Sequence, residues 1–422
     1  MRLFLGSVFY GWVIVAVAFV TMAISVNART AFSLLFPPIV DEFAWDRAAT
    51  AGAFSFGFLF SAVLSPLLGK LMDRYGPRLV IEAGVACVAI GLLLAAHISA
   101  RWQLYATLGV LVGAGSVCMS YTGQAIYLPN WFVRRRGLAM SIAFSGVGVG
   151  SIVLLPALQL LIDAAGWRAA CTILGIVVLV VLAPLNLLVR KRPQDLGLHP
   201  DGEASAPPRS ATPGTPSGAD WTLGTAIRTA RFWSLAFAYA CGMYAWYAVQ
   251  IHQTRYLLEI GFSGQQAAWA LGLVSLVGIP GQIALGHLSD RIQREWVWCI
   301  GQVGFAICYA ALLALEHAPV APLLWLMVLA QGFLGYGVTS VVGSIPAEAF
   351  HGRHYGSIFG AIMGIGIAGG AIGPWITGVA YDLTGSYAPG FALALACCVA
   401  SGVAIWFNRP TSSRLAQATP PA

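Results

Sequence analysis

Arg29 is the residue whose position most directly suggests chemistry. It lies in a long apolar stretch that predicts a helix over residues 9–36, eight residues before Pro37. At 1.5 Å per residue, this places it about 12 Å from the outer end of that helix. An arginine at such a depth costs at least about 2.5–3.5 kcal/mol on insertion scales unless it meets water or an anion. Because a guanidinium can bind a carboxylate through two parallel hydrogen bonds, we expect Arg29 to bind an anionic substrate. The alternative is an arginine that reaches outward to the headgroups.

A second candidate is a charged motif that occurs twice. The sequence GKLMDR stands at residues 69–74 and GHLSDR at residues 286–291, so both copies read G-x-x-x-D-R, 217 residues apart. Each copy ends a hydrophobic run and places its charges where a membrane helix would meet water. Two copies in matching halves indicate a duplicated architecture, which is typical of secondary transporters.

The composition excludes a soluble domain. Hydrophobic residues make up 58% of the 422 residues and charged residues only 9%, with a mean hydropathy of +0.78. Soluble domains average roughly 25% charged residues. The chain has room for about twelve spans of roughly 20 residues each. We expect helices at 9–36, 48–71, 78–97, 102–131, 137–162, 167–190, 231–258, 265–288, 296–315, 321–350, 355–381 and 387–408.

These helices predict an all-α membrane protein with two pseudo-symmetric six-helix bundles. Residues 1–190 form the N-terminal bundle, 191–229 a cytoplasmic linker and 230–422 the C-terminal bundle. The segment 193–220 is rich in Pro, Gly, Ser, Ala and Thr, which predicts a flexible linker. Glycine rows in the helices expected at 137–162 and 355–381 favour close helix packing over a nucleotide site.

The basic residues indicate the orientation. Of the 23 Lys and Arg, 18 fall on the side of the termini and the linker, so both termini are expected in the cytoplasm, in a bacterial inner membrane. The net charge of +7 does not indicate nucleic-acid binding, because these residues are spread over short loops. The eight cysteines lie inside apolar runs and are expected to be packing residues.

Several stretches resemble a known family. The pattern from Gly69 to Arg78 resembles the signature loop of the major facilitator superfamily, although Gln293 and Glu295 replace the expected Gly and Arg in the second copy. YGWVIV at residues 10–15, FAWDRA at 43–48 and NWFVRRRGLA at 130–139 resemble the monocarboxylate-porter and oxalate/formate-exchanger branch. So does His252, followed by Tyr256, Leu257 and Gly261.

The resemblance implies which residues gate and which bind. Contacts at one end would hold the two halves in a closed arrangement, with a carboxylate at a helix N-terminus and paired arginines contributing roughly 1–3 kcal/mol. The alternative is that these charges only anchor helix ends in headgroups. The expected gating residues are Asp73, Arg74, Arg78, Arg134, Asp290, Arg291 and Arg353.

The first, fourth, seventh and tenth helices line the cavity in this superfamily. The candidates for substrate binding on these helices, beside Arg29, are therefore Tyr121, Gln124, His252 and Tyr336. The alternative for His252 is a hydrogen-bonded packing residue. Gln282 of the eighth helix is a further candidate, as a neutral hydrogen-bond donor.

One departure from the family bears on the substrate. The family usually carries an arginine in the eighth helix, four residues before the glycine of the second motif, and that position here is Gln282. Gly278 stands where an acidic partner often sits. The anion-binding charge would then rest on Arg29 alone, and the usual proton-coupling pair is in doubt.

The expected function is therefore secondary active transport of a small organic anion, a monocarboxylate, by alternating access. Proton symport and anion exchange both stay open. Efflux of a neutral or aromatic compound is one alternative, and a non-transporting membrane sensor is another. No enzymatic activity, cofactor or metal site is expected, since no such motif is present. The expected partners are the substrate, protons and membrane lipids, and the expected state is a monomer.

Overall fold

The computed structural model describes residues 9–45, 47–203, 221–350 and 352–408, and these residues form helices and connecting turns without any strand. Ten helices in these ranges are long and apolar enough to cross a membrane. One of them, residues 136–186, turns sharply at Gly166, whose φ of 80° breaks the helical path, so it makes two crossings. The 30-residue helix α11 (Ala230–Glu259) packs along two of the ten and completes twelve membrane segments. The expected all-α fold with twelve segments is confirmed.

The N-terminal segments contain nine α-helices and three stretches of other helix type. The α-helices are α1 (Tyr10–Thr30), α2 (Phe32–Phe43), α3 (Arg47–Tyr75), α4 (Pro77–Ala95), α5 (Arg101–Leu104), α6 (Val112–Met119), α7 (Tyr121–Tyr127), α8 (Arg136–Val177) and α9 (Ala183–Asn186). The π-helices η1 (Tyr105–Leu111) and η3 (Val178–Leu182) and the 3-10 helix η2 (Leu128–Asn130) continue three of them.

The C-terminal segments follow the same plan. Beside α11 they comprise α12 (Gly264–Ser289), α13 (Arg294–Leu315), α14 (Ala321–Leu329), η6 (Ala330–Leu334), η7 (Gly335–Ser340), α15 (Ser344–Ala349), α16 (Tyr355–Thr384), α17 (Ala388–Ala404) and η8 (Ile405–Asn408). The tenth segment is therefore broken into α-, π- and 3-10-helical pieces, which is common where a helix carries a functional site.

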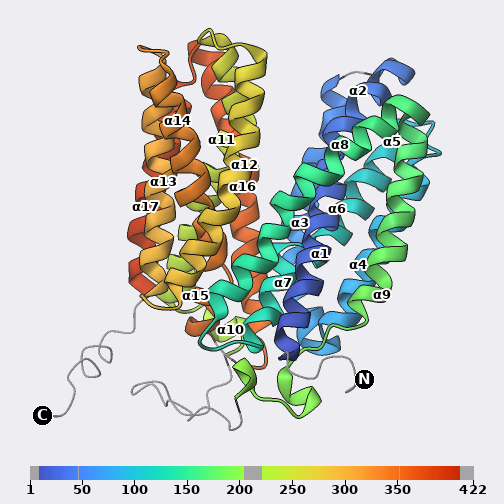
Figure 1. Ribbon diagram of the computed structural model, residues 1–422, viewed down its shortest axis with the longest axis vertical. Helices are drawn as coiled ribbons and strands as arrows, with labels where there is room; N and C mark the ends of the chain where they lie inside the picture. The colour runs from blue at the N-terminus through green and yellow to red at the C-terminus, as the bar shows by residue number, and fades with distance from the viewer. Residues whose placement is uncertain (1–8, 46, 204–220, 351, 409–422) are drawn as a thin grey trace, which may run out of the picture.

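The helices gather into two bundles (Figure 1). The N-terminal bundle holds α1–α9 and the C-terminal bundle holds α11–α17. The bundles approach each other at the end where α1 begins and α17 ends, and they diverge toward the opposite end. We call the first end, which carries Asp73 and Asp290, the basic end, and the other, which carries Glu42 and Glu259, the far end. Where the bundles meet, α3 packs against α16 and α8 against α12.

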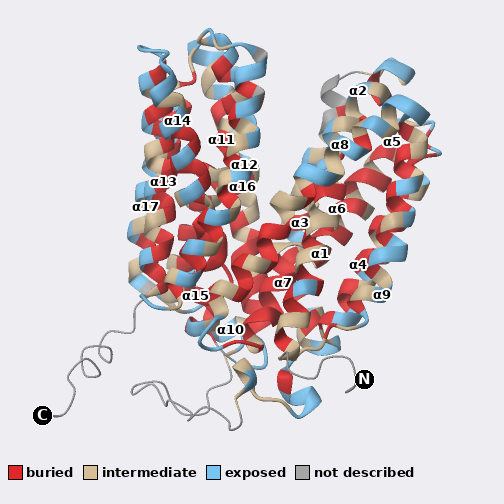
Figure 2. Ribbon diagram, viewed as in Figure 1, coloured by how far each residue is buried: buried red, intermediate tan, exposed pale blue. Residues whose placement is uncertain are grey.

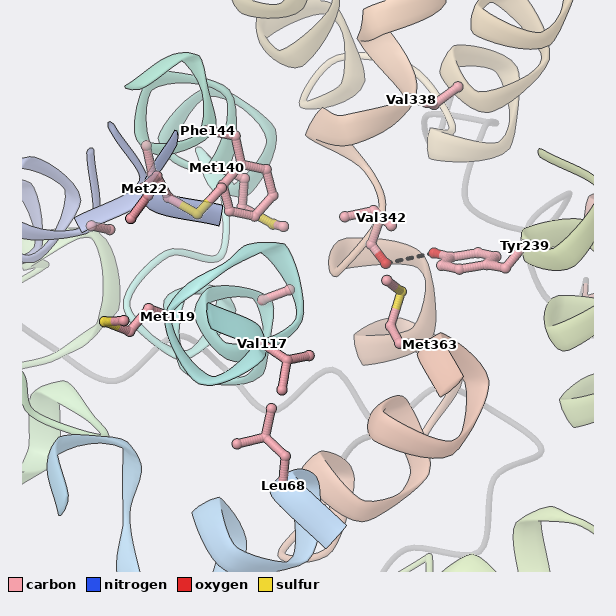
Figure 3. Packing of buried hydrophobic residues seen from close by; sticks show 14 of the residues in the cluster. Met22, Leu68, Val117, Met119, Met140, Phe144, Tyr239, Val338, Val342 and Met363 are labelled. Atoms are coloured by element: carbon pink, nitrogen blue, oxygen red, sulfur yellow. Dashed lines mark hydrogen bonds between the residues drawn. The ribbon is translucent and has the colours of Figure 1, made fainter. Parts of the chain in front are cut away.

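Buried residues follow this arrangement. They run along the inside of each bundle and gather where the two meet, while exposed residues cover the outer faces (Figure 2). At the junction, Leu68 and Val117 of the N-terminal bundle lie opposite Val342 and Met363 of the C-terminal bundle (Figure 3). The hydroxyl of Tyr239 donates to the Val342 carbonyl at 2.5 Å, which satisfies a backbone group at the broken tenth segment.

The first membrane segment is longer than expected. It was expected to end at residue 36, but α2 continues to Phe43 with Pro37 and Pro38 inside it, and the break falls earlier, between α1 and α2 at Ala31. Prolines are tolerated in membrane helices because neighbouring groups satisfy the freed carbonyls. Arg29 therefore lies 14 residues before the end of the segment, about 21 Å by helical rise, and deeper than the expected 12 Å.

The linker is more ordered than its composition indicates. Residues 193–203 form two short turns, η4 (Pro193–Leu196) and η5 (Pro200–Gly202), and α10 (Leu223–Ala226) precedes α11. The Asp201 carboxylate accepts hydrogen bonds from the backbone N–H groups of Val133 and Arg134, both at 2.9 Å. Both ends of the segment that was expected to be a flexible linker thus contain short helical turns. Its middle, residues 204–220, lies outside the described residues.

Small residues let α1 and α8 pack backbone to backbone. A Cβ at Gly150 would lie 2.2 Å from the Ala23 carbonyl oxygen, and one at Gly146 equally close to that of Phe19. This close approach lets the Asn27 amide donate to the Val147 carbonyl at 3.0 Å. The expected packing role of this glycine row agrees with these contacts.

We predict that Gly150→Ala lowers the stability of the folded protein. The added methyl group would force α1 and α8 apart, and overpacking of this kind costs about 1–3 kcal/mol. Gly272→Ala in α12 is the matched control, because nothing lies within 4 Å of a Cβ there. Thermal unfolding of the detergent-purified variants should show a lower Tm for Gly150→Ala only, and equal Tm values would contradict the packing argument.

Candidate functional site

Arg29 lies in the last turn of α1, against the aromatic face of α3. Its guanidinium carbon is 3.8 Å from the centroid of the Phe58 ring and 5.8 Å from that of Phe54. The Nη2 atom is buried, and no group among the described residues accepts a hydrogen bond from it. None of the ion pairs formed within the described ranges includes Arg29. The cation is held by ring faces and keeps its donors available to an anion.

The C-terminal bundle meets this cation through α11. The ring of Tyr247 packs edge-on against Phe58, with centroids 5.3 Å apart, so one phenylalanine touches both Arg29 and the other bundle. Next to it, Trp246 stacks on Tyr336 of η7 at 4.5 Å and 21°. The Gln250 amide donates to the Tyr336 hydroxyl at 2.6 Å. Arg29 and Tyr336, far apart in sequence, thus belong to one aromatic region between the bundles.

Of two further expected residues, Tyr121 lies in this region, and Gln282 carries a buried polar group in α12. Tyr121, at the start of α7, packs edge-on against Phe144 at 5.0 Å, and its phenol lies close enough to those of Tyr247 and Tyr336 to interact electrostatically. Gln282 of α12 is only 4% exposed, and its Nε2 atom has no hydrogen-bond partner among the described residues. A buried amide without a partner is a candidate donor to a ligand.

The other two expected binding residues are used within their own bundles. Gln124 is fully buried, its amide donates to the Met119 carbonyl at 3.0 Å, and its oxygen accepts from the Tyr127 hydroxyl. His252 Nε2 lies 2.9 Å from the Pro374 carbonyl, and its ring packs against Tyr387. We therefore leave Gln124 and His252 out of the proposed site.

At the basic end, Asp73 of α3 caps a helix of the opposite bundle. Its carboxylate accepts hydrogen bonds from the backbone N–H groups of Gly356 and Ser357, at 3.0 and 2.8 Å, and from the Ser357 hydroxyl at 2.9 Å. Gly356 and Ser357 lie in the first turn of α16. One turn earlier on α3, a Cβ at Gly69 would lie 1.8 Å from the Gly356 carbonyl oxygen. The glycine allows the contact, and the carboxylate stabilises it through the free N–H groups and the helix dipole.

The second motif repeats this geometry in reverse. Asp290, which follows α12, accepts from the backbone N–H groups of Gly137 and Leu138 at the start of α8, at 2.8 and 3.0 Å. A Cβ at Gly286 would lie 2.7 Å from the Gly137 carbonyl oxygen. Burial raises the pKa of Asp290, while the two backbone donors and Arg294 act in the opposite direction. Both aspartates therefore hold the two bundles together at the basic end.

Four of the expected gating arginines do not contact either aspartate among the described residues. The side chains of Arg74, Arg78 and Arg291 are exposed, and Arg134 pairs with Glu203 of the linker at 3.0 Å. Exposed pairs of this kind contribute little, about 0–1 kcal/mol. Arg353 lines the same gap between the bundles as Asp73 and Lys191. The expectation that Arg74, Arg78, Arg134 and Arg291 close the gap between the bundles is corrected, whereas Arg353 stays a prediction. The sequence pattern shows charge at the helix ends but does not show which way each side chain turns.

A different arginine is buried at the basic end, beside Asp290. Arg294 is 7% exposed, forms an ion pair with Glu348 at 2.6 Å and lies 3.8 Å from the Asp290 carboxylate. The corresponding support for Asp73 comes from Lys191, which donates to the Asp73 carbonyl at 2.8 Å. Sequence reasoning missed both residues. The spacing of Asp290 and Arg294, four residues apart, was the available signal.

Comparison with known proteins identifies the family. The model of the major facilitator superfamily matches residues 17–286 and 254–421, which together cover most of the chain. The chain belongs to the major facilitator superfamily. Within the superfamily, it is 28% identical to monocarboxylate transporter 13 of Bos taurus over 96% of this chain and 92% of that protein. It is also 28% identical to human monocarboxylate transporter 11, over 95% and 83% of the two chains. These relatives place it in the monocarboxylate-porter-like branch.

Solved structures of other superfamily members share its fold. The fucose:proton symporter of E. coli superposes with a TM-score of 0.69 at 15% identity, covering 95% of this chain and 98% of that one. The human organic anion transporter TETRAN gives 0.70 at 16% identity, covering 94% and 99%. This major facilitator protein is accordingly an integral membrane transporter and not an enzyme.

We predict that Asp73→Asn and Asp290→Asn each loosen a helix of the opposite bundle. Removing the charge weakens hydrogen bonds worth about 1.5–3 kcal/mol, so exchange of the capped amides should rise about tenfold or more. Hydrogen exchange measured by mass spectrometry should change at residues 356–357 for Asp73→Asn and at residues 137–138 for Asp290→Asn.

Asp195→Asn is the control for both variants, because within the part of the chain that the structure describes Asp195 accepts only from the Arg192 N–H of its own turn, at 3.1 Å. Unchanged exchange in the opposite bundle of both variants would show that the aspartates do not hold the basic end closed.

Proposed function

We propose that this protein is a secondary active transporter of a small organic anion, a monocarboxylate, and that Arg29 binds the carboxylate. The observation that carries the proposal is the guanidinium of Arg29, which lies over the Phe58 ring at the junction of the bundles and whose buried Nη2 atom has no partner among the described residues. A buried cation without an anionic partner is costly, and binding a carboxylate would offset that cost through charge-assisted hydrogen bonds. The relatives named as monocarboxylate transporters support the same substrate class.

The proposed mechanism is alternating access. Residues 1–190 and 230–422 move as two units joined by the linker 191–229, and the basic end faces the cytoplasm. In the present arrangement the Asp73 and Asp290 contacts hold the basic end closed while the bundles diverge at the far end. Releasing those contacts would open the basic end to the site around Arg29. Proton symport and anion exchange both fit this cycle.

Efflux of a neutral aromatic compound is the second candidate function. It is favoured by Gln282 at the position of the family's arginine and by the stacked pair Trp246 and Tyr336. A neutral substrate would not need Arg29, so substitutions of Arg29 separate the two functions.

We predict that Arg29→Gln lowers carboxylate transport by at least about 30-fold, because loss of one partner of a buried charge contact costs 2 kcal/mol or more. Arg29→Lys should retain part of the activity, since it keeps the charge but loses the bidentate geometry. The measurement is counterflow of labelled monocarboxylates in proteoliposomes, with and without an imposed pH gradient.

Arg255→Gln is the matched control. Arg255 lies at the far end of α11, largely exposed, and pairs only with Glu259 four residues later among the described residues. Its removal should leave counterflow near the wild-type rate. Wild-type counterflow by Arg29→Gln would rule out the anion site, and transport of neutral compounds alone would favour the second candidate.

A further inference from the structure

The part of the site contributed by the C-terminal bundle is aromatic and neutral. Trp246 and Tyr336 stack with their rings nearly parallel, and both side chains are half-buried, so they keep some accessible ring surface. The hydrogen bond from Gln250 fixes the Tyr336 hydroxyl, which restricts rotation of that ring. A pre-organised pair of rings is suited to binding another flat ring by offset stacking.

Tyr336 can take its position because residue 278 is a glycine and has no side chain. A Cβ at Gly278 of α12 would lie 2.4 Å from the Tyr336 ring and 3.0 Å from a second atom of it. The ring therefore lies directly against the α12 backbone, in space that any larger residue at position 278 would take. The Tyr336 ring thus fills the space that a charged side chain at position 278 would occupy.

The charge of the site points to a single anionic group. Arg29 is its cation, and the ion pairs among the described residues all lie at the basic end or the far end. One carboxylate would match one guanidinium. A second carboxylate would be left without a partner in a region of low dielectric, where an uncompensated charge is strongly unfavourable.

The two chemical features lie on different bundles but are joined by contact. Arg29 packs on Phe58, and Phe58 packs against Tyr247, the residue next to Trp246. A ligand with a carboxylate at one end and a flat apolar group at the other would touch both bundles at once. Such a ligand would favour the arrangement in which the bundles come together around it.

We infer that the substrate is an aromatic monocarboxylate, with its carboxylate on Arg29 and its ring stacked on Trp246 and Tyr336. The inference rests on the proposed function and narrows its substrate class. Aliphatic monocarboxylates would bind Arg29 but would add no further ring to the Trp246–Tyr336 stack. Neutral aromatic compounds would contact the ring pair but would leave Arg29 without an anion.

Four probes test the inference: benzoate, cyclohexanecarboxylate and the neutral benzamide, which are of similar size, and the smaller aliphatic anion lactate. Binding to the purified full chain is measured by thermal shift, and competition by counterflow in proteoliposomes. An aromatic contact contributes about 0.5–1.5 kcal/mol beyond its area, so benzoate should bind about three- to tenfold tighter than cyclohexanecarboxylate. Benzamide should bind at least tenfold more weakly than benzoate.

Two variants assign the preference to the stacked rings. Trp246→Leu should bring the ratio of benzoate to cyclohexanecarboxylate affinity toward one, while Tyr336→Phe keeps the ring and should retain most of it. If Trp246→Leu does not fold, the wild-type ratio alone decides.

Equal, Arg29-dependent binding of benzoate and cyclohexanecarboxylate would overturn the aromatic inference and leave the proposed function standing. Carboxylate binding that is absent, or unchanged in Arg29→Gln, would overturn the proposed function as well.

Discussion

The closed basic end depends on one repeated interaction, an aspartate of one bundle that caps a helix of the other. Asp73 binds the first turn of α16, and Asp290 binds the first turn of α8. Each aspartate follows a glycine by four residues, so the two lie on one helix face. The glycine lets the backbones touch and the carboxylate satisfies the N–H groups that a helix start leaves unpaired. The spacing of the motif is thus explained by a single contact surface.

The two aspartate contacts are alike in both halves of the chain and hold the basic end closed. The residues that differ between the halves lie between the bundles, around Arg29. Arg29 is a cation of the N-terminal bundle held on ring faces, whereas the C-terminal bundle supplies the stacked rings of Trp246 and Tyr336. Gly278 makes room for the Tyr336 ring. The two halves therefore share a mechanism of closure but differ in what they could offer a ligand. An asymmetric ligand fits such a site better than a symmetric one.

The sequence was a good guide to the aspartates and a poor guide to the arginines. A short carboxylate at a helix end has few places to go, so the motif spacing was enough to place Asp73 and Asp290. Long, flexible arginines can turn to solvent, as Arg74 and Arg291 do, or inward, as Arg294 does toward Glu348. Likewise, the polar residue Gln124 was a reasonable candidate for the site, but its amide is taken up by Met119 and Tyr127 of its own segment.

By itself the sequence determined the membrane class, the twelve segments, the repeated motif and the presence of one arginine in an apolar stretch, but not the depth of that arginine. These follow from hydrophobic length and from the spacing of repeated motifs, which are properties of the chain alone. Only the tertiary structure decided that the Nη2 atom of Arg29 has no partner among the described residues, that Phe58 links Arg29 to Tyr247, and that Tyr336 occupies the space beside Gly278. These facts depend on how each helix is rotated and where α1 and the tenth segment break. Rotation and breaks are set by contacts between residues far apart in the sequence, which no local pattern contains.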